Sequence, residues 1–243
     1  MDVAPCANFF ACCIILRLHC TPLARRFNHL YSFYMNRFLF LLVFAFCTVF
    51  WGCTKPGDST VSKAVTAFSS QNYDLALELF NQALNESTNY SDAIIYNFIA
   101  NVYAAKEDFL TCAEYMEKSL ELKPDYRGFV TLGATYQNLK NYDEAESNFK
   151  KAIELNPKKG EAFASLGILF LEEEKIDLAI ENLEKGALLA PKIAVIHANL
   201  AVSYAKAGRI QDAQNSLNRA EELDCVNLGQ FIQRVQESYN SKL

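Results

Sequence analysis

Histidines and catalytic motifs are scarce in this chain. It has three histidines in 243 residues, and His197 alone follows Cys53. From Cys53 onward the sequence contains no H-E-x-x-H, G-x-S-x-G, G-x-G-x-x-G or G-x-x-x-x-G-K-[ST] motif. The usual arrangements of metalloproteases, α/β-hydrolases and nucleotide-binding proteins are therefore missing. We expect no catalytic residue, no metal site and no cofactor in this part, and we interpret the protein as not an enzyme.

The chain also lacks an excess of basic residues. Its formal net charge is −5. The first 52 residues carry Arg17, Arg25, Arg26 and Arg37 against Asp2, whereas the remainder has 19 basic and 27 acidic residues. Phosphate binding requires clustered Lys and Arg. The absence of a basic stripe argues against nucleic acid as a partner.

Paired metal-binding cysteines are absent as well. Six of the eight cysteines lie in the first 53 residues, and no C-x-x-C spacing occurs. These early cysteines indicate a segment that is absent from the working protein. Cys112 is predicted to be a small buried hydrophobic residue and Cys225 a free thiol in a loop. They lie in distant parts of the repeat described below, too far apart for a disulfide.

An apolar run occupies residues 38–51, with Thr48 as its only polar interruption, and Met35-Asn36-Arg37 precedes it. A positive start and a short apolar core are typical of a secretory signal. A membrane-spanning helix needs about 20 apolar residues, so a span is the weaker alternative. We predict that residues 35–52 are the signal and that residues 1–34 are a gene-start overcall or an unstructured extension. The competing interpretation is an extended positive region.

The junction Gly52-Cys53 resembles the lipobox of bacterial lipoproteins, in which a small residue precedes the lipidated cysteine. Phe50 and Trp51 stand where that family usually has an aliphatic and a small residue. The resemblance implies that Cys53 carries covalent lipid, including acyl chains such as palmitate, and becomes the new amino terminus. Several acyl chains anchor a protein stably. The alternative is a signal with an incidental cysteine.

The remaining chain is a repeat with a period of about 34 residues. One small-residue column runs through Ala76, Cys112, Ala145, Ala179 and Ala213, and a second through Ala83, Ser119, Ala152, Gly186 and Ala220. Residues seven apart share one helix face. Small residues on that face allow a neighbouring helix to approach closely.

The first helix of each unit, which precedes the helix with the small-residue columns, shows a repeated pattern of its own, seen in L-G-A-T-Y (132–136) and L-G-I-L-F (166–170). Pro124, Pro157 and Pro191 end the second helices. The pattern resembles the tetratricopeptide repeat (TPR). That resemblance implies an all-α fold, a right-handed TPR α-solenoid of helix-turn-helix repeats with a C-terminal capping helix. His197 falls in the aromatic column of Phe129 and Phe163 and is predicted to be a packing residue.

The resemblance covers residues 57–227, after an anchor and short tether at 53–56. It divides them into five units: 57–92, 93–125, 126–159, 160–193 and 194–227. Lys63 departs from an apolar column of the first unit and Cys225 replaces the proline of the last. Residues 228–243 are predicted to form a capping helix and tail, because Phe231, Ile232, Val235 and Tyr239 share one apolar face.

In TPR proteins the first helices line a concave groove that receives peptides or helices. When the groove positions of the family are matched to this sequence, the resemblance implies the following partner-binding residues: Asn97, Asn101, Arg127, Val130, Ala134, Gln137, Glu161, Ala164, Ile168, Leu171, Val195, Ala198 and Val202. The lysines of the TPR carboxylate clamp are missing. The acidic run 172–174 is predicted to be a solvated turn, with steering of a basic partner as the alternative.

Together these features predict a membrane-anchored TPR lipoprotein in the bacterial cell envelope. Its expected location is the outer membrane facing the periplasm, held by the lipid on Cys53. Its expected role is a non-catalytic protein–protein interaction scaffold or assembly adaptor with a protein or peptide in the concave groove. The alternative is a periplasmic binding module for an apolar small ligand, associated with a transporter. No feature indicates an oligomeric state.

Overall fold

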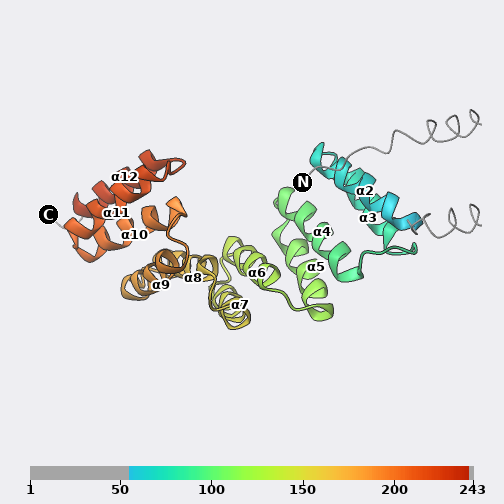
Figure 1. Cartoon of the computed structure of the whole chain (residues 1–243), viewed down its shortest axis with the longest axis horizontal. Helices are drawn as coiled ribbons and strands as arrows, with labels where there is room; N and C mark the ends of the chain where they lie inside the picture. Colours follow the sequence, from blue (N-terminus) through green and yellow to red (C-terminus); the bar gives the residue numbers. More distant parts are fainter. Residues whose placement is uncertain (1–54, 241–243) are drawn as a thin grey trace, which may run out of the picture. The chain divides into compact units, whose positions relative to one another are not determined.

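The computed structural model describes residues 55–240, which form only α-helices and turns (Figure 1). The helices are α2 (Pro56–Ser69), α3 (Tyr73–Ala83), α4 (Asp92–Ala105), α5 (Phe109–Leu122), α6 (Tyr126–Asn138), α7 (Tyr142–Leu155), α8 (Gly160–Glu172), α9 (Ile176–Leu189), α10 (Ala194–Ala207), α11 (Ile210–Glu222) and α12 (Leu228–Asn240). The predicted all-α class is confirmed. The segments predicted to be the signal and its extension, and Cys53, lie outside the described residues. No helix in the described range is long and apolar enough to cross a membrane.

Consecutive helices pack in pairs, α2 with α3 through α10 with α11. Each pair turns through one residue with positive φ: Gln71, Glu107, Lys140, Glu174 and Gly208. Only glycine adopts that conformation without steric cost. A polar residue precedes the second helix in all five pairs, and in two of them the Asn72 and Asp108 side chains accept a hydrogen bond from the backbone. The same turn therefore recurs at the same place in each unit.

Small residues let the two helices of a pair come close together. The second-helix small columns are buried throughout, as predicted. A Cβ added to Gly160 would lie 2.5 Å from the Gly186 carbonyl oxygen, and one on Gly167 would lie 2.7 Å from Leu183 Cγ and 3.0 Å from its backbone nitrogen. Side chains larger than hydrogen would force these helices apart.

The core is divided along the stack. Three clusters of buried residues follow one another: one in α2–α4, one in α4–α6 and one running from α7 to α12. Stacked aromatic rings help to join the first two pairs, with the centroids of Phe80 and Phe98 5.3 Å apart. Each unit therefore buries its apolar residues against its immediate neighbours, as expected for a repeat protein.

The first helix forms in full despite the departure at Lys63. Ile99 and Leu132, in the same column of the next two units, are almost completely buried, whereas Lys63 is exposed. Within the described residues no helix precedes α2, so none covers Lys63. At the start of α2, Asp58 accepts hydrogen bonds from the Asn89 backbone and the Thr88 hydroxyl, which ties the helix to the loop after α3.

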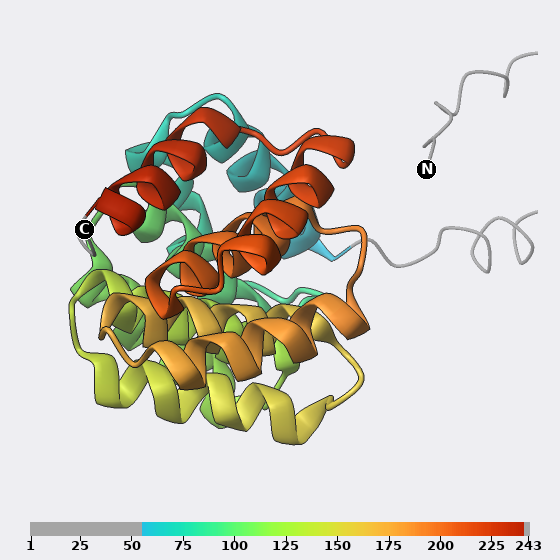
Figure 2. The same cartoon turned by 90° about the vertical axis from the view of Figure 1, so that its left-hand side faces the viewer.

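The last helix, α12, lies mainly against α10 and contacts α11 at few points (Figure 2). Val235 and Ser238 are its buried residues. Leu228, Phe231 and Tyr239 are partly buried against the same core cluster. The amphipathic pattern of the tail thus forms a helix with most of its apolar face towards the stack, but Ile232, predicted to share that face, is 38% exposed.

Candidate partner-binding surface

The residues predicted to bind a partner lie on α4, α6, α8 and α10, the first helices of the second to fifth units. We refer to this set as the first-helix face. On α4 the two asparagines are half-buried and already hydrogen-bonded. Asn101 Nδ2 donates to Asn97 Oδ1 over 2.9 Å, and Asn97 Nδ2 donates to Met116 Sδ over 3.5 Å. The α4 portion of the face is therefore polar and held in place by α5.

The α6 portion is the most open part of the first-helix face. Arg127 is exposed, and Val130, Ala134 and Gln137 are half-buried. Their spacing of three and four residues places them along one side of the helix. Val130 and Ala134 pack at the edge of the largest core cluster. This strip offers a partner an apolar centre with one positive charge at its end.

The α8 portion is mixed. Glu161 is exposed and Ile168 half-buried, but Ala164 and Leu171 are 6% and 3% exposed. These two predicted contact residues belong to the core. Ile168 is thus the apolar side chain of α8 that a partner can reach along this face.

A tyrosine that the sequence analysis did not single out joins the starts of α6 and α8. Tyr126 Oη donates to Glu161 Oε2 (3.2 Å) and accepts a hydrogen bond from the Ala162 backbone nitrogen (3.0 Å). Burial, reinforced by the charge of Glu161, raises the pKa of Tyr126 to about 12. The predicted contact residue Glu161 is therefore positioned by the preceding unit.

On α10 the structure differs from the expectation of an open groove. Val195 is 43% exposed, but Ala198 and Val202 are completely buried. The physical reason at Val202 is α12, which packs on α10 and supplies side chains beside it. Sequence columns could not reveal this, because they show which side of α10 would face a groove and not what covers it.

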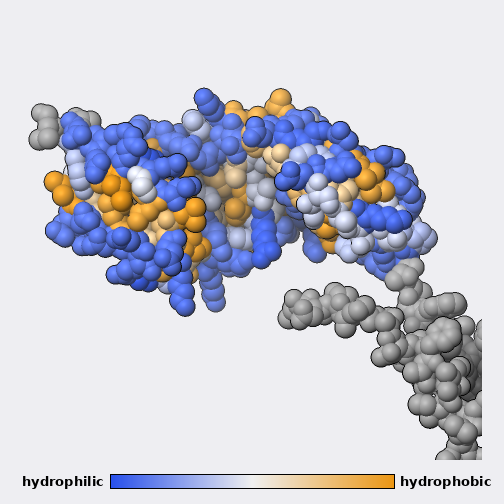
Figure 3. Space-filling view, turned by 90° about the horizontal axis from the view of Figure 1, so that it is seen from above, coloured by the Kyte–Doolittle hydropathy of each residue, from blue (hydrophilic) through white to orange (hydrophobic). Residues whose placement is uncertain are grey.

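A pocket of about 340 Å³ lies where α8, α10 and α12 meet. Its lining combines the predicted contact residues Leu171 and Val202 with charged side chains, among them Glu174, Lys206 and Arg234. Lys206 Nζ donates to both carboxylate oxygens of Glu174, over 2.7 and 2.9 Å. The fourth and fifth units thus leave a small, largely charged opening beside α12. Hydrophobic side chains also reach the surface of this end of the stack (left in Figure 3).

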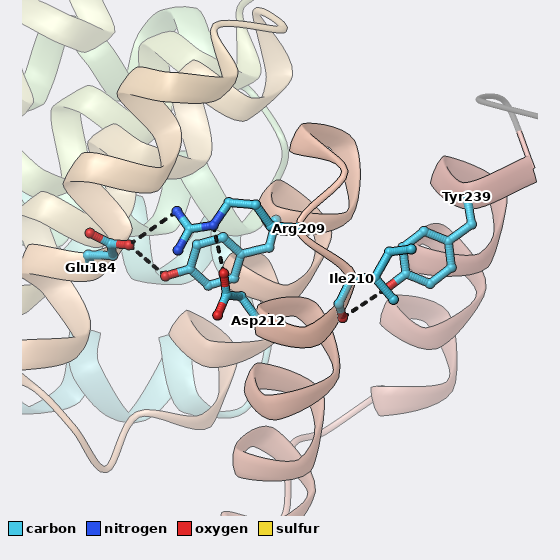
Figure 4. A network of polar contacts seen from close by, with 6 residues as sticks. Glu184, Arg209, Ile210, Asp212 and Tyr239 are labelled. Atoms are coloured by element: carbon cyan, nitrogen blue, oxygen red, sulfur yellow. Dashed lines mark hydrogen bonds and ion pairs between the residues drawn. The ribbon is translucent and has the colours of Figure 1, made fainter.

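Polar contacts also join the fourth unit to the fifth (Figure 4). Tyr204 Oη donates to Glu184 Oε1 over 2.6 Å, and the Arg209 guanidinium lies 4.3 Å from the Tyr204 ring and 2.7 Å from Asp212 Oδ2. The polar contact from α12 to α11 is longer: Tyr239 Oη donates to the Ile210 carbonyl over 3.4 Å. The fourth and fifth units are therefore bonded more closely to each other than α12 is to α11.

The titratable side chains of the described residues are dispersed. These residues contain no group of three or more His, Cys, Asp or Glu residues that could hold a metal ion. His197 Nε2 lies 3.1 Å from the Pro191 carbonyl oxygen, to which it can donate. Cys112 is fully buried, as predicted, and burial raises the pKa of its thiol. A protonated, enclosed thiol is a poor nucleophile.

Comparison with known proteins identifies the repeat. Residues 93–126 and 127–159 each match a family model described as tetratricopeptide repeat. Over 91 residues the chain is 33% identical to heat shock protein STI1 of Saccharomyces cerevisiae, and over 94 residues it is 30% identical to the sti1 homologue of Schizosaccharomyces pombe. The matches cover 37% and 38% of this chain but only 15% of each of those proteins.

Solved structures show the same fold over more of the chain. MamA from Desulfovibrio magneticus RS-1 superposes with a TM-score of 0.61 at 17% identity, covering 69% of this chain and 94% of that one. YrrB, a TPR protein reported to have an unusual peptide-binding site, superposes with a TM-score of 0.57 at 23% identity, covering 76% and 91%. The described helices are therefore a TPR solenoid, as predicted.

Replacing Tyr126 by Phe tests the link between α6 and α8. The change leaves the Ala162 N–H without its acceptor, so the free energy of unfolding at pH 7 should fall by about 1–2 kcal/mol. Folding favours the protonated phenol, because its folded pKa of about 12 exceeds the ordinary value of 10.0. This contribution is therefore complete below pH 10 and disappears between pH 10 and 12. Urea unfolding at pH 7, 10 and 12 measures both effects.

Tyr90→Phe is the matched control, because Tyr90 is exposed in the loop before α4. It should leave the free energy of unfolding at pH 7 unchanged. An unfolding free energy of Tyr126→Phe equal to that of the wild type at pH 7 would show that the Tyr126 bridge does not stabilise the stack.

Proposed function

We propose that this TPR solenoid is a non-catalytic scaffold or assembly adaptor that binds a protein or peptide through its first-helix face. The observation that carries the proposal is the partly open strip on α6 and α8, where Val130, Ala134 and Ile168 keep apolar surface accessible. Arg127 and Glu161 stand exposed beside the strip. An apolar centre with a charged rim is the usual composition of a protein-binding surface.

The strip suits a segment of protein better than a small apolar molecule. The pocket at α8, α10 and α12 has a volume of about 340 Å³, near the lower limit for ligand sites. Charged side chains form much of its lining, and an apolar ligand would have to desolvate them. The physical properties of the surface thus favour the scaffold over the alternative of a periplasmic carrier for an apolar ligand.

The same proposal places the solenoid at a membrane. Its support is the sequence: an apolar run at 38–51 followed by Gly52-Cys53. The first described helix begins at Pro56, three residues after Cys53. A lipid on Cys53 would hold the repeat close to the surface of the bacterial envelope, with the outer membrane facing the periplasm as the proposed location. The first-helix face would then recruit its partner beside that membrane.

Ile168→Asp tests the binding surface. Burying an isoleucine side chain contributes about 1.5–3 kcal/mol, and each 1.4 kcal/mol is tenfold in affinity. We expect partner recovery in crosslinking pull-downs from membranes, quantified by mass spectrometry, to fall at least tenfold. Circular dichroism should show unchanged helix content, because Ile168 is only half-buried.

The matched control is Leu178→Asp, an equally drastic change at a 43% exposed residue of the second helix α9. It should leave recovery of the same proteins intact. Equal recovery with wild-type protein, Ile168→Asp and Leu178→Asp would exclude the first-helix face as the binding surface.

Cys53→Ala tests the anchor separately. Without the thiol no lipid can be attached, so the variant should lack the mass of the acyl chains that the wild-type protein carries. Intact-mass analysis of wild-type and variant protein purified from the membrane and soluble fractions measures this. A wild-type protein without acyl mass, or a variant with the same acyl mass, would contradict the lipoprotein assignment but leave the scaffold proposal standing.

A further inference from the structure

The position of α12 breaks the packing rule of the stack. Between successive units, the first helix of one unit packs mainly on the second helix of the unit before, as α8 does on α7 and α10 on α9. If α12 continued the solenoid, it would lie mainly on α11. It lies instead mainly on α10, a first helix. The last helix has therefore moved from the position of a sixth unit onto the first-helix face.

This position covers residues that the repeat would otherwise offer to a partner. Val202 of α10 is fully buried and shares a pocket lining with Arg234 and Ser238 of α12. Val235 is 3% exposed and belongs to the same core cluster as Leu171 and Val202. An amphipathic helix laid into an apolar groove is a general mode of peptide recognition. In this structure the helix is part of the chain itself.

α12 buries fewer residues than any other described helix. Two of its thirteen residues are buried, whereas nine of the fourteen in α10 are. Elements with few buried contacts open most readily. α12 also lies outside the five helix pairs, so its release would separate none of them.

The charges around α12 indicate what kind of helix fits. Arg234 and Glu237 of α12 line the same pocket as Glu172 and Glu174 at the carboxyl end of α8, where Lys206 already pairs with Glu174. Leu228, Phe231, Val235 and Tyr239 supply apolar side chains with spacings of three and four residues. The pattern of the present occupant is thus an amphipathic helix with four such apolar positions, a basic residue just before the third and an acidic residue two positions after it.

We propose that α12 occupies in cis the helix-binding site of the fourth and fifth units, and that a partner helix of the same pattern binds by displacing it. The inference rests on the first-helix face of the proposed function and adds its regulation and the class of its partner. Binding is weak while α12 is docked, because only the fraction of molecules with an open site can bind.

The test uses a fluorescently labelled synthetic peptide of residues 226–243 and the purified full-length chain. Val235→Asp in the protein places a charge at the buried centre of the α12 contact. In fluorescence anisotropy we expect this variant to bind the wild-type peptide at least about tenfold more tightly than the wild-type protein does. The reason is that α12 is released in a tenth or less of the wild-type molecules, which weakens their apparent affinity by that factor. A peptide carrying the same Val235→Asp change should not bind.

Two further variants control for folding and position. Phe231→Ala shortens a half-buried side chain of α12 and should also increase the affinity for the peptide, by a smaller factor. It replaces Val235→Asp if that variant does not fold. Gln236→Asp, a change at an exposed position of α12, should bind the peptide as wild-type protein does. Circular dichroism and light scattering accompany each measurement.

Equal peptide affinity in wild-type, Val235→Asp and Phe231→Ala proteins would overturn the proposal, as would the absence of binding in all three. A wild-type dimer that Val235→Asp converts to a monomer would also overturn it, because α12 would then be docked on a second copy. The peptide assay needs no natural partner, so failure of the pull-down experiment and failure of this one are distinguishable.

Discussion

Close approach of the two helices within each pair is the constraint on which the structure depends. Gly160 meets the Gly186 carbonyl, and Gly167 meets Leu183, at distances that leave no room for a Cβ. The small columns keep the paired helices near enough for large side chains such as Phe149 and Leu183 to fill the remaining space completely. Each pair then buries its other faces against the pairs before and after it. A stack of such pairs places all first helices in one series and leaves part of their surface open.

Much of this architecture follows from the sequence, because the residues that permit close packing recur at a fixed period. The columns through Ala76 and Ala83 predict the paired helices, and Cys112 is predicted to be buried because it replaces alanine in one of them. The exposed Lys63 shows where such reasoning meets its limit. A column gives the environment of an average unit, and α2 has no described helix on its other side, so the burial expected from the column does not apply.

The candidate surface was only partly predictable for a related reason. Spacing along one helix places Val130, Ala134 and Ile168 on the first-helix face, and these side chains are half-buried. It also places Val202 there, yet α12 lies on that part of α10. An amphipathic pattern at residues 228–239 shows that a helix has an apolar side but not which surface receives it. The choice between α11 and α10 depends on tertiary contacts that no local pattern contains.

A solenoid held by such local contacts has a direct experimental consequence, which hydrogen exchange of Gly167→Val measures. The added side chain would collide with the Leu183 backbone and with the Ala179 carbonyl oxygen 3.1 Å from the Cβ position, and overpacking of this kind costs about 1–3 kcal/mol. Faster exchange should be confined to α7–α10, while α2–α5 keep wild-type protection. Uniform loss of protection from α2 to α12, or unchanged protection in α8 and α9, would contradict this description of the protein.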